Sequence, residues 1–323
     1  MTHQIQPNHP HTLAARGLGI ALGLIADAAL GDPRRGHPVA AFGRYATQIE
    51  KATWRDSTAA GALHWAACVL PVTALGIGVE RWASRRWWTQ ALATAVATWA
   101  ALGARSLVAE GLAMSARLAA DDLDGAREQL PHLCGRVPDD LDEPELARAT
   151  AESLAENCSD AVVATLFWGA LAGVPGVLAH RAINTMDAMV GHLSPRYRHF
   201  GTVSARLDDA ANYVPARLTG ALACALAGTV GGSPRRAWRI MRRDARDHPS
   251  PNGGWCEAAW AGALGVQLGG RNVYGSRIEE RGLLGDGPRP DASAVRRASG
   301  LVAAVTGAAG ALAVASTWLR GRR

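Results

Sequence analysis

The chain has 323 residues, enough for one large domain or two of ordinary size. Its net charge of +6 rests on 34 basic residues, among which Lys51 is the only lysine. Chemistry through a lysine imine is therefore disfavoured, because Lys51 lies in a polar stretch without catalytic neighbours. A basic charge suits a nucleic acid or a membrane surface, but no DNA-binding motif accompanies it, so we expect no nucleic-acid partner.

The five cysteines lie far apart, and no two form a Cys-x-x-Cys pair. This spacing predicts neither a cysteine zinc site nor a disulfide framework. We expect each cysteine to be a small apolar filler.

Six windows, taken in chain order, approach the roughly 20 apolar residues that a bilayer-spanning helix needs. Four are clean and two are interrupted, by Gly173, Pro175 and Gly176 in one case and by Arg217 in the other. The first twelve residues hold no Lys or Arg, so we expect no signal peptide. The windows are 13–31, 59–79, 89–109, 161–179, 214–232 and 300–319.

The windows predict an all-α fold, that of a polytopic helical integral membrane protein whose partner is the lipid bilayer. We expect one membrane-embedded domain over residues 1–323, multi-pass in the cell (inner) membrane, with polar excursions at 114–160 and 233–298. The first excursion reads as amphipathic helices with turns. Basic residues flank the windows on both sides, so the charge pattern leaves the orientation open.

The stretch "AESLAENCSD" carries the first candidate cluster. On one helix Glu152, Glu156 and Asp160 are spaced by four and share a face. Such like charges repel unless a cation or a ligand lies between them, whereas a solvated helix face is the alternative. The neighbouring Asn157 is a candidate for substrate binding.

The stretch "HRAINTMDAMVGH" follows directly on an apolar run. Its spacing of three places Arg181, Asn184 and Asp187 on one helical face. Ionisable groups near hydrocarbon are costly and tend to mark a functional site, or else to pair with one another. An Arg181–Asp187 ion pair that anchors the helix end is the alternative.

The stretch "ARLDDAANYVPARLTG" gives an acidic edge flanked by arginines. Its candidate residues are Arg206, Asp208, Asp209, Asn212 and Arg217. Carboxylates suit Mg²⁺, which completes its shell with phosphate and water, and arginine suits phosphate or carboxylate. A helix N-cap is the alternative explanation of the Asp pair.

The stretch "HPSPNGGWCEAAWAGALGVQLGG" contains a tight turn at Pro251–Gly254 and a second turn expected at Gly269–Gly270. Asn252 and Gly253 are the candidates here, because exposed amides of such a turn can form an anion nest. A packing turn is the alternative. The absence of Gly-x-Ser-x-Gly and His-Glu-x-x-His motifs leaves carboxylates, amides and arginines, which suit Mg²⁺ and phosphate substrates.

Taken together, these motifs resemble the CobD/CbiB family of cobalamin-biosynthesis proteins, the adenosylcobinamide-phosphate synthases. The resemblance covers most of the chain, from "DAALGDPRRGHPVAAFG" through "AENCSDAVVATLFW", "HRAINTMDAMVGH", "YRHFGTVSARLDDAANYVPARLT" and "SPNGGWCEAAWAGALGVQLGG" to Tyr274 and Gly275. The chain departs from the family pattern at several positions, with Cys158 for Thr, Ala188 for Ser and Arg181 for Lys among them.

The resemblance implies an inner-membrane enzyme that joins the propionate carboxylate of adenosylcobyric acid to aminopropanol or its O-phosphate by an amide bond. It implies ATP and Mg²⁺ as companions. It also implies association with other membrane enzymes of the cobalamin pathway. The resemblance supplies no map of catalytic residues, so we assign their roles by physical argument.

A carboxylate is a poor electrophile until ATP converts it to an acyl phosphate, which the amine then attacks. We expect Glu156, Asp160 and Asp187 to hold Mg²⁺. Arg206 and Arg217 would neutralise phosphate charge, and Asp208 or Asp209 would accept the ammonium proton. The amides Asn157, Asn184, Asn212 and Asn252 would orient the corrin substituents, with Arg181 and Gly253 also binding substrate.

If every window spans the membrane, the "AENCSD" and "NTMD" clusters face opposite sides. We therefore expect the broken 161–179 segment to be re-entrant or to bury its ends in protein. Two alternatives stay open: a membrane Mg²⁺-dependent prenyl- or polyisoprenyl-phosphate transferase, whose second Asp-rich pair is missing, and a transporter, whose internal repeat is missing.

Overall fold

The structure is a computed structural model that describes residues 10–32, 36–274 and 277–322. Gly275, the last residue of the family resemblance, lies outside the described residues. The chain divides into two units that each combine distant segments: unit 1 is 1–102, 165–208 and 309–323, and unit 2 is 103–164 and 209–308. The expectation of one membrane-embedded domain stays a prediction.

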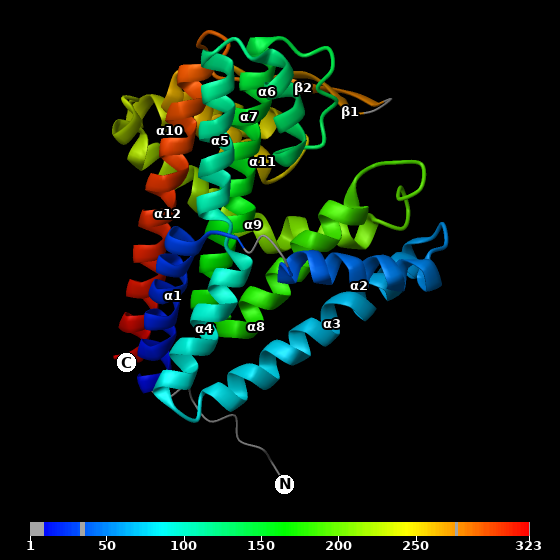
Figure 1. Cartoon of the computed structure of the whole chain (residues 1–323), viewed down its shortest axis with the longest axis vertical. Helices are drawn as coiled ribbons and strands as arrows, with labels where there is room; N and C mark the ends of the chain where they lie inside the picture. Colours follow the sequence, from blue (N-terminus) through cyan, green and yellow to red (C-terminus); the bar gives the residue numbers. More distant parts are fainter. Residues whose placement is uncertain (1–9, 33–35, 275–276, 323) are drawn as a thin grey trace. The chain divides into compact units, whose positions relative to one another are not determined.

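Long helices make up unit 1 (Figure 1). Its helices are α1 (Pro10–Leu30), α2 (Pro38–Thr53), α3 (Thr58–Ala83), α4 (Trp87–Ala101), α8 (Ala164–Met186, whose first residue belongs to unit 2) and the π-helical turn Asp187–Gly191. Helices α9 (Thr202–Leu226) and α12 (Ala292–Gly321) each contribute one part to unit 1 and one to unit 2.

Close packing of α1 on α4 depends on two glycines one helical turn apart. A Cβ added at Gly19 would lie 2.6 Å from the Cβ of Thr94, and one added at Gly23 would lie 2.6 Å from the Cβ of Thr98. Small residues at this spacing let helix backbones approach closely, as membrane helices commonly do. The tight helix pair thus involves two of the apolar windows that the sequence predicted, 13–31 and 89–109.

Unit 2 combines shorter helices with a hairpin. It contains α5 (Ala104–Ala119), α6 (Leu123–Gln129), α7 (Glu143–Asn157), the π-helical turn Cys158–Val163, α10 (Pro234–Asp244), α11 (Gly253–Leu264), β1 (Leu268–Tyr274) and β2 (Arg277–Leu284). Short 3₁₀ turns cover Leu130–His132, Ala227–Val230 and Ala245–Asp247. The core between α5, α6 and α7 contains Met114, Leu118, Leu130 and Leu146.

The antiparallel hairpin corrects one sequence prediction. Gly269 and Gly270 do not close a turn: they lie in β1, where the register to β2 shifts between them. Both have positive φ, of 79° and 91°, a conformation that glycine adopts without a Cβ penalty. The all-α class is confirmed for the rest of the described chain, to which this small two-stranded sheet is an addition.

Six described stretches are long and apolar enough to cross a membrane: Thr12–Leu30, Thr58–Ala83, Trp87–Ala119, Glu143–Gly191, Thr202–Val230 and Ala292–Gly321. They correspond to the six predicted windows. In α3, large apolar side chains such as Leu63, Leu70 and Leu75 are more than half exposed, as lipid-facing side chains would be. The expected span 89–109 is interrupted, because α4 ends at Ala101 and α5 begins at Ala104.

The predicted interruption of the 161–179 window is confirmed. Within α8, Gly173 has φ 69° and ψ −147°, which are not helical values, and Pro175 follows it. The next amide, that of Val174, donates to Glu80 Oε2 at 3.0 Å rather than to a helical carbonyl. A side chain from α3 thus caps the second half of α8.

Candidate functional site

In unit 1, the structure joins two of the predicted residues directly. Asn184 lies on α8 and Asp208 on α9, and the Asn184 amide donates to Asp208 Oδ1 at 3.3 Å. Asp208 is only 8% exposed, so its carboxylate is fixed by a neighbour and shielded from bulk water. A carboxylate held in this way is suited to receive a proton or an ammonium group.

The other predicted residues of unit 1 lie on the same elements. Arg181 is on α8, Asp187 opens the π-helical turn, and both are half-buried and have interaction partners. Arg206 on α9 is exposed and has no partner among the described residues. Its guanidinium is therefore available to an anion, and phosphate binding by Arg206 stays a prediction.

A small cavity of about 220 Å³ in unit 1 has Arg181 in its wall. The remaining lining is mostly apolar and includes Phe42, Val72, Leu75 and Leu178. This cavity is far too small for a corrinoid, so it fits only an apolar substituent or a lipid chain next to the arginine.

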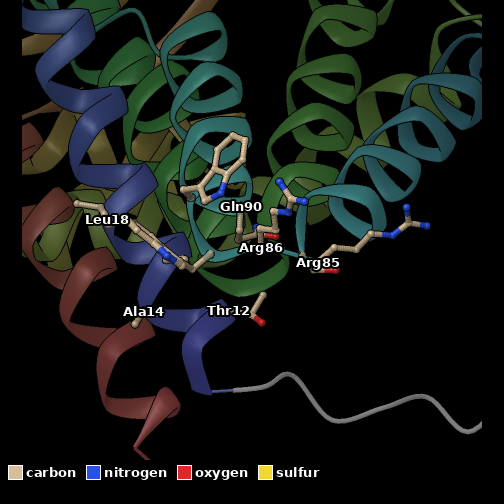
Figure 2. Close-up of a pocket in the computed structure, with 10 residues that line it drawn as sticks. Thr12, Ala14, Leu18, Arg85, Arg86 and Gln90 are labelled. Atoms are coloured by element: carbon tan, nitrogen blue, oxygen red, sulfur yellow. The ribbon is translucent and has the colours of Figure 1, made fainter.

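A larger cavity of about 720 Å³, also in unit 1, lies where the sequence predicted no site. Figure 2 shows its wall, where Thr12 and Leu18 of α1 face Gln90 of α4 and the Arg85–Arg86 turn. None of the predicted catalytic residues lines it. With Trp87 and Trp88 beside these arginines, this is the expected composition of a membrane interface.

In unit 2, Arg217 and Asn252 form a second predicted group. Arg217 Nη1 donates to Asn252 Oδ1 at 2.9 Å and to the Tyr213 carbonyl at 2.8 Å, while Nη2 donates to the Pro251 carbonyl at 3.1 Å. The Arg217 guanidinium also stacks 3.4 Å from the centroid of the Tyr213 ring. Nη1 and one N–H of Nη2 are therefore engaged by protein, so Arg217 positions the loop before α11, and its binding of phosphate stays a prediction.

Asn252 and Asp209 meet through the backbone. The buried Asn252 amide donates to the Asp209 carbonyl oxygen at 2.8 Å, so the Asp209 carboxylate is not part of this contact. Asn212, on the same helix α9, is 1% exposed and has a partner within the protein. The buried amides thus act first as structural links of unit 2.

The structure corrects the prediction of an anion nest at Pro251–Gly254. The amides of Asn252 and Gly253 donate to Ser250 Oγ, at 3.2 and 3.1 Å, and Pro251 has no amide hydrogen. These two amides are engaged by Ser250, and the turn starts α11, so it does not present them to a ligand.

The shared face of Glu152, Glu156 and Asp160 is also corrected. Helix α7 ends at Asn157, and the wider π-helical turn that follows changes the angular position of Asp160. Glu152 is neutralised by ion pairs with Arg136 and with Arg148. Asn157 donates to Ser153 Oγ and to the Ser153 carbonyl, within its own helix.

Glu156 instead meets two residues that sequence reasoning missed. Ligand atoms of Glu156, His248 and Glu257 all lie within 4.8 Å of one another. His248 Nε2 lies 3.1 Å from Glu257 Oε1, and Arg281 Nη1 lies 3.3 Å from the same oxygen. One signal was present in the sequence: Glu257 is the only charged residue of the apolar stretch 253–264.

The electrostatics of this cluster are visible in His248. Burial lowers the pKa of His248, but the hydrogen bond from the imidazole to Glu257 and the charges of Glu257 and Glu156 outweigh it, so the pKa is raised. The carboxylates therefore favour the protonated imidazole, which forms an ion pair with Glu257.

The predicted Mg²⁺ ligands fall in both units: Glu156 and Asp160 in unit 2 and Asp187 in unit 1. Their joint coordination of Mg²⁺ stays a prediction. Asp160 and Asp187 each have an interaction partner within the protein, whereas the Glu156 carboxylate lies among the atoms of a possible metal-binding group in the described chain.

Comparison with known proteins gives one consistent result. A model of the CobD/CbiB protein family matches residues 20–302. The chain is 50% identical over 309 residues to the cobalamin biosynthesis protein CobD of Mycobacterium tuberculosis (strain ATCC 25618 / H37Rv), covering 96% of this chain and 98% of that protein. Proteins of the same name match in Geobacter metallireducens, at 43% over 286 residues, and in Rhodobacter capsulatus, at 42% over 291; each match covers 87% of this chain and 90% of the relative. No solved structure matches the chain.

Proposed function

Because the chain belongs to the CobD/CbiB family of cobalamin-biosynthesis proteins, we propose that it forms the amide bond between the propionate carboxylate of adenosylcobyric acid and aminopropanol or its O-phosphate. The family favours this function over the transferase and transporter alternatives. ATP supplies the activation: its terminal phosphoryl group passes to the carboxylate, giving ADP and an acyl phosphate. The amine nitrogen then forms the C–N bond, phosphate leaves, and a base takes the amine proton.

The contact between Asn184 and Asp208 is the structural observation that most supports this proposal. Asp208 is a buried carboxylate on a fixed partner, and it serves as the base that takes the amine proton. Arg206, exposed and without a partner among the described residues, binds the phosphate of the nucleotide or of the aminopropanol phosphate.

Mg²⁺ would neutralise phosphate charge when bound, and Glu156 fits one of its ligands. Asp160 is the proposed companion in unit 2, and Asp187 is a proposed metal ligand in unit 1; each also has an interaction partner within the protein. Asn157, Asn212 and Asn252 support the site mainly through their internal hydrogen bonds, and Arg217 holds the Asn252 loop.

The test is a turnover assay on the purified, detergent-solubilised chain with adenosylcobyric acid, aminopropanol phosphate, ATP and Mg²⁺, followed by mass. We expect conversion to the cobinamide phosphate that is lost without ATP. Asp208→Asn should lower kcat by about 10²–10⁴-fold, the usual contribution of a general base. Asp124→Asn is the matched control, because Asp124 is a surface carboxylate with a side chain 95% exposed.

Asp187→Ala should also abolish turnover while the protein still accumulates in the membrane. Near-normal activity of Asp208→Asn would remove the base assignment, and near-normal activity of Asp187→Ala would remove the metal-ligand assignment. A folded chain that binds the corrinoid but forms no amide would contradict the ligase proposal itself.

A further inference from the structure

Three side chains from separate parts of unit 2 converge on one buried point. Glu156 lies in the last turn of α7, His248 lies in the loop that follows α10, and Glu257 lies in α11. One ligand atom from each lies within 4.8 Å of the other two. Glu257 is completely buried and His248 is 6% exposed, so the point where they meet is shielded from water.

The carboxylates at this point are not satisfied by the protein. Glu257 Oε2 is buried and has no hydrogen-bond partner in the described chain, and the Glu156 carboxylate accepts no hydrogen bond from any described residue. A buried charged oxygen without a partner is strongly unfavourable. These oxygens are therefore the ones that a bound cation would satisfy.

Two cationic groups already face this point. Arg281 Nη1 lies 3.3 Å from Glu257 Oε1 and 3.0 Å from His248 Nε2, and the His248 imidazole pairs with the same carboxylate when it is protonated. A metal ion would therefore bind in exchange for the imidazole proton and for the contact of Arg281 with Nε2, and it would give the free Glu257 oxygen a partner.

The histidine is oriented for this role. Its Nδ1 lies against the backbone of Ser250, 3.0 Å from the amide nitrogen and 3.4 Å from the carbonyl oxygen. Nε2 is thus the nitrogen that faces Glu257 and Arg281, 3.1 Å from Glu257 Oε1 and 3.0 Å from Arg281 Nη1. It can ligate a metal when Nδ1 carries the ring proton and donates it to the Ser250 carbonyl oxygen.

Gly253 makes room for the carboxylate. A Cβ added at Gly253 would lie 2.6 Å from Glu156 Oε1 and 2.9 Å from His248 Cε1. The turn "PNGG" therefore serves the cluster sterically, in place of the anion nest that the sequence predicted. A glycine is required there for Glu156 and His248 to approach each other.

We propose that Glu156, His248 and Glu257 bind one divalent transition-metal ion of the Mn²⁺ or Zn²⁺ type. A mixed set of one imidazole and two carboxylates favours such an ion over Mg²⁺, which binds oxygen ligands. This set gives Glu156 other companions than the proposed Mg²⁺ ligands Asp160 and Asp187, and the Mn²⁺ titration below decides whether Glu156 belongs to it. The proposal rests on the proposed function only for the use of the ion, because binding is measured without any substrate.

The test uses the full chain, purified in detergent, stripped with a chelator and titrated with Mn²⁺. We expect one tightly bound Mn²⁺ per chain, with electron spin-echo modulation from a coordinated ¹⁴N. Zn²⁺ should displace the Mn²⁺ and an equal concentration of Mg²⁺ should not. His248→Gln should abolish the nitrogen modulation, and Glu257→Gln should weaken Mn²⁺ binding about 100-fold or more.

Glu110→Gln is the matched control, since Glu110 and His132 form an acid–imidazole pair, 3.3 Å apart, outside the cluster. This variant should bind Mn²⁺ as the wild type does. If Glu257→Gln does not fold, Glu156→Gln gives the same test from a half-buried position.

Absence of bound Mn²⁺ and Zn²⁺ in the folded wild type would overturn the metal site. So would Mn²⁺ bound without nitrogen modulation, or unchanged affinity in a folded Glu156→Gln or Glu257→Gln variant. Turnover plays no part in these outcomes, so a failure here is distinguishable from a failure of the ligase proposal.

Discussion

Arg148 shows how a single buried side chain can hold a unit together. It is 1% exposed, and its Nη1 donates to the Gly269 carbonyl at 2.7 Å and to Asn272 Oδ1 at 2.8 Å. Glu152, equally buried, pairs with Arg148 and accepts the Gly269 amide at 2.7 Å. The Arg148–Glu152 ion pair thus holds β1 against α7. Strand β2 pairs with β1 and positions Arg281 next to Glu257.

At the residue scale we predict that Glu152→Gln strongly destabilises unit 2. Removing one partner of a buried ion pair leaves the arginines without their counter-charge, which costs about 3–5 kcal/mol. Denaturant unfolding in detergent measures the change. Glu128→Gln, at an exposed position of α6, should change the free energy of unfolding by less than about 0.5 kcal/mol. Equal effects of the two variants would contradict the prediction.

At the scale of elements, α8 depends on its capping contact. Glu80 Oε2 accepts a hydrogen bond from the Val174 amide. Glu80 Oε1 accepts one from Arg16 at 2.6 Å and one from Gln90 at 3.1 Å. A carboxylate at the start of a helical segment is favoured by the local dipole. The break in α8 is therefore a defined feature of the fold, stabilised by side chains from α1, α3 and α4.

We predict that Gly173→Ala lowers stability by about 1–3 kcal/mol, because an alanine is strained at φ 69°. Its Cβ would also lie 2.6 Å from Glu80 Oε1. Thermal unfolding in detergent measures the loss. Gly78→Ala in α3 is the control: a Cβ there meets no described atom within 4 Å, so it should be neutral or raise stability by up to about 1 kcal/mol. A neutral Gly173→Ala would show that the break is not strained for other residues.

The start of α12 makes a second prediction at this scale, a dependence on pH. Asp291 accepts the Ala294 amide at 2.8 Å and the Ser293 hydroxyl at 2.7 Å. Burial raises the pKa of Asp291, but these hydrogen bonds outweigh it and hold the pKa below its usual 3.8. Because the folded-state pKa is the lower one, the stabilisation is present above pH 3.8 and is lost as the pH falls through the folded value.

Accordingly, Asp291→Asn should keep the stability measured at pH 7, since Asn also caps helices, but should lose less stability on acidification than the wild type. Asp291→Ala should lose about 1 kcal/mol already at pH 7. Unfolding curves recorded from pH 7 to pH 3 measure both effects. An acid loss in Asp291→Asn as steep as in the wild type would rule out this carboxylate as a source of it.

At the scale of the whole molecule, the six apolar stretches predict a multi-pass membrane protein. Helix α3 has 26 residues and is thus about 39 Å long, longer than the hydrocarbon core of a bilayer. Exposed Trp82 lies near its C-terminal end, and exposed Trp87 and Trp88 begin α4 after the short turn that follows. Aromatic residues of this kind are typical of the lipid–water boundary.

Cysteine labelling tests this arrangement. In a chain with Cys134→Ser, whose other cysteines are buried, we predict that Thr58→Cys and Ser84→Cys react with an impermeant maleimide from opposite sides of the membrane. Intact spheroplasts and inverted vesicles provide the two sides. Labelling of both positions from one side would show that α3 does not cross.

How much the sequence predicted differs between the fold and the site. The apolar windows predicted the long helices because a membrane helix is encoded locally, by about 20 consecutive side chains. The break at Gly173 was equally readable, since glycine and proline act on their own backbone. The hairpin was not predicted, because Gly269 and Gly270 look like turn residues and the partner that fixes them, Arg148, is 121 residues away.

For the site, the sequence located the motifs and the tertiary structure decided their partners. Composition and windows determined a helical membrane protein, and the motif order determined the family, because both are properties of consecutive residues. That Asn184 holds Asp208, that arginines neutralise Glu152, and that Glu156 meets His248 and Glu257 followed only from the fold. The physical reason is that charge balance and coordination depend on distance in space, and residues 156, 248 and 257 become neighbours only when unit 2 has packed.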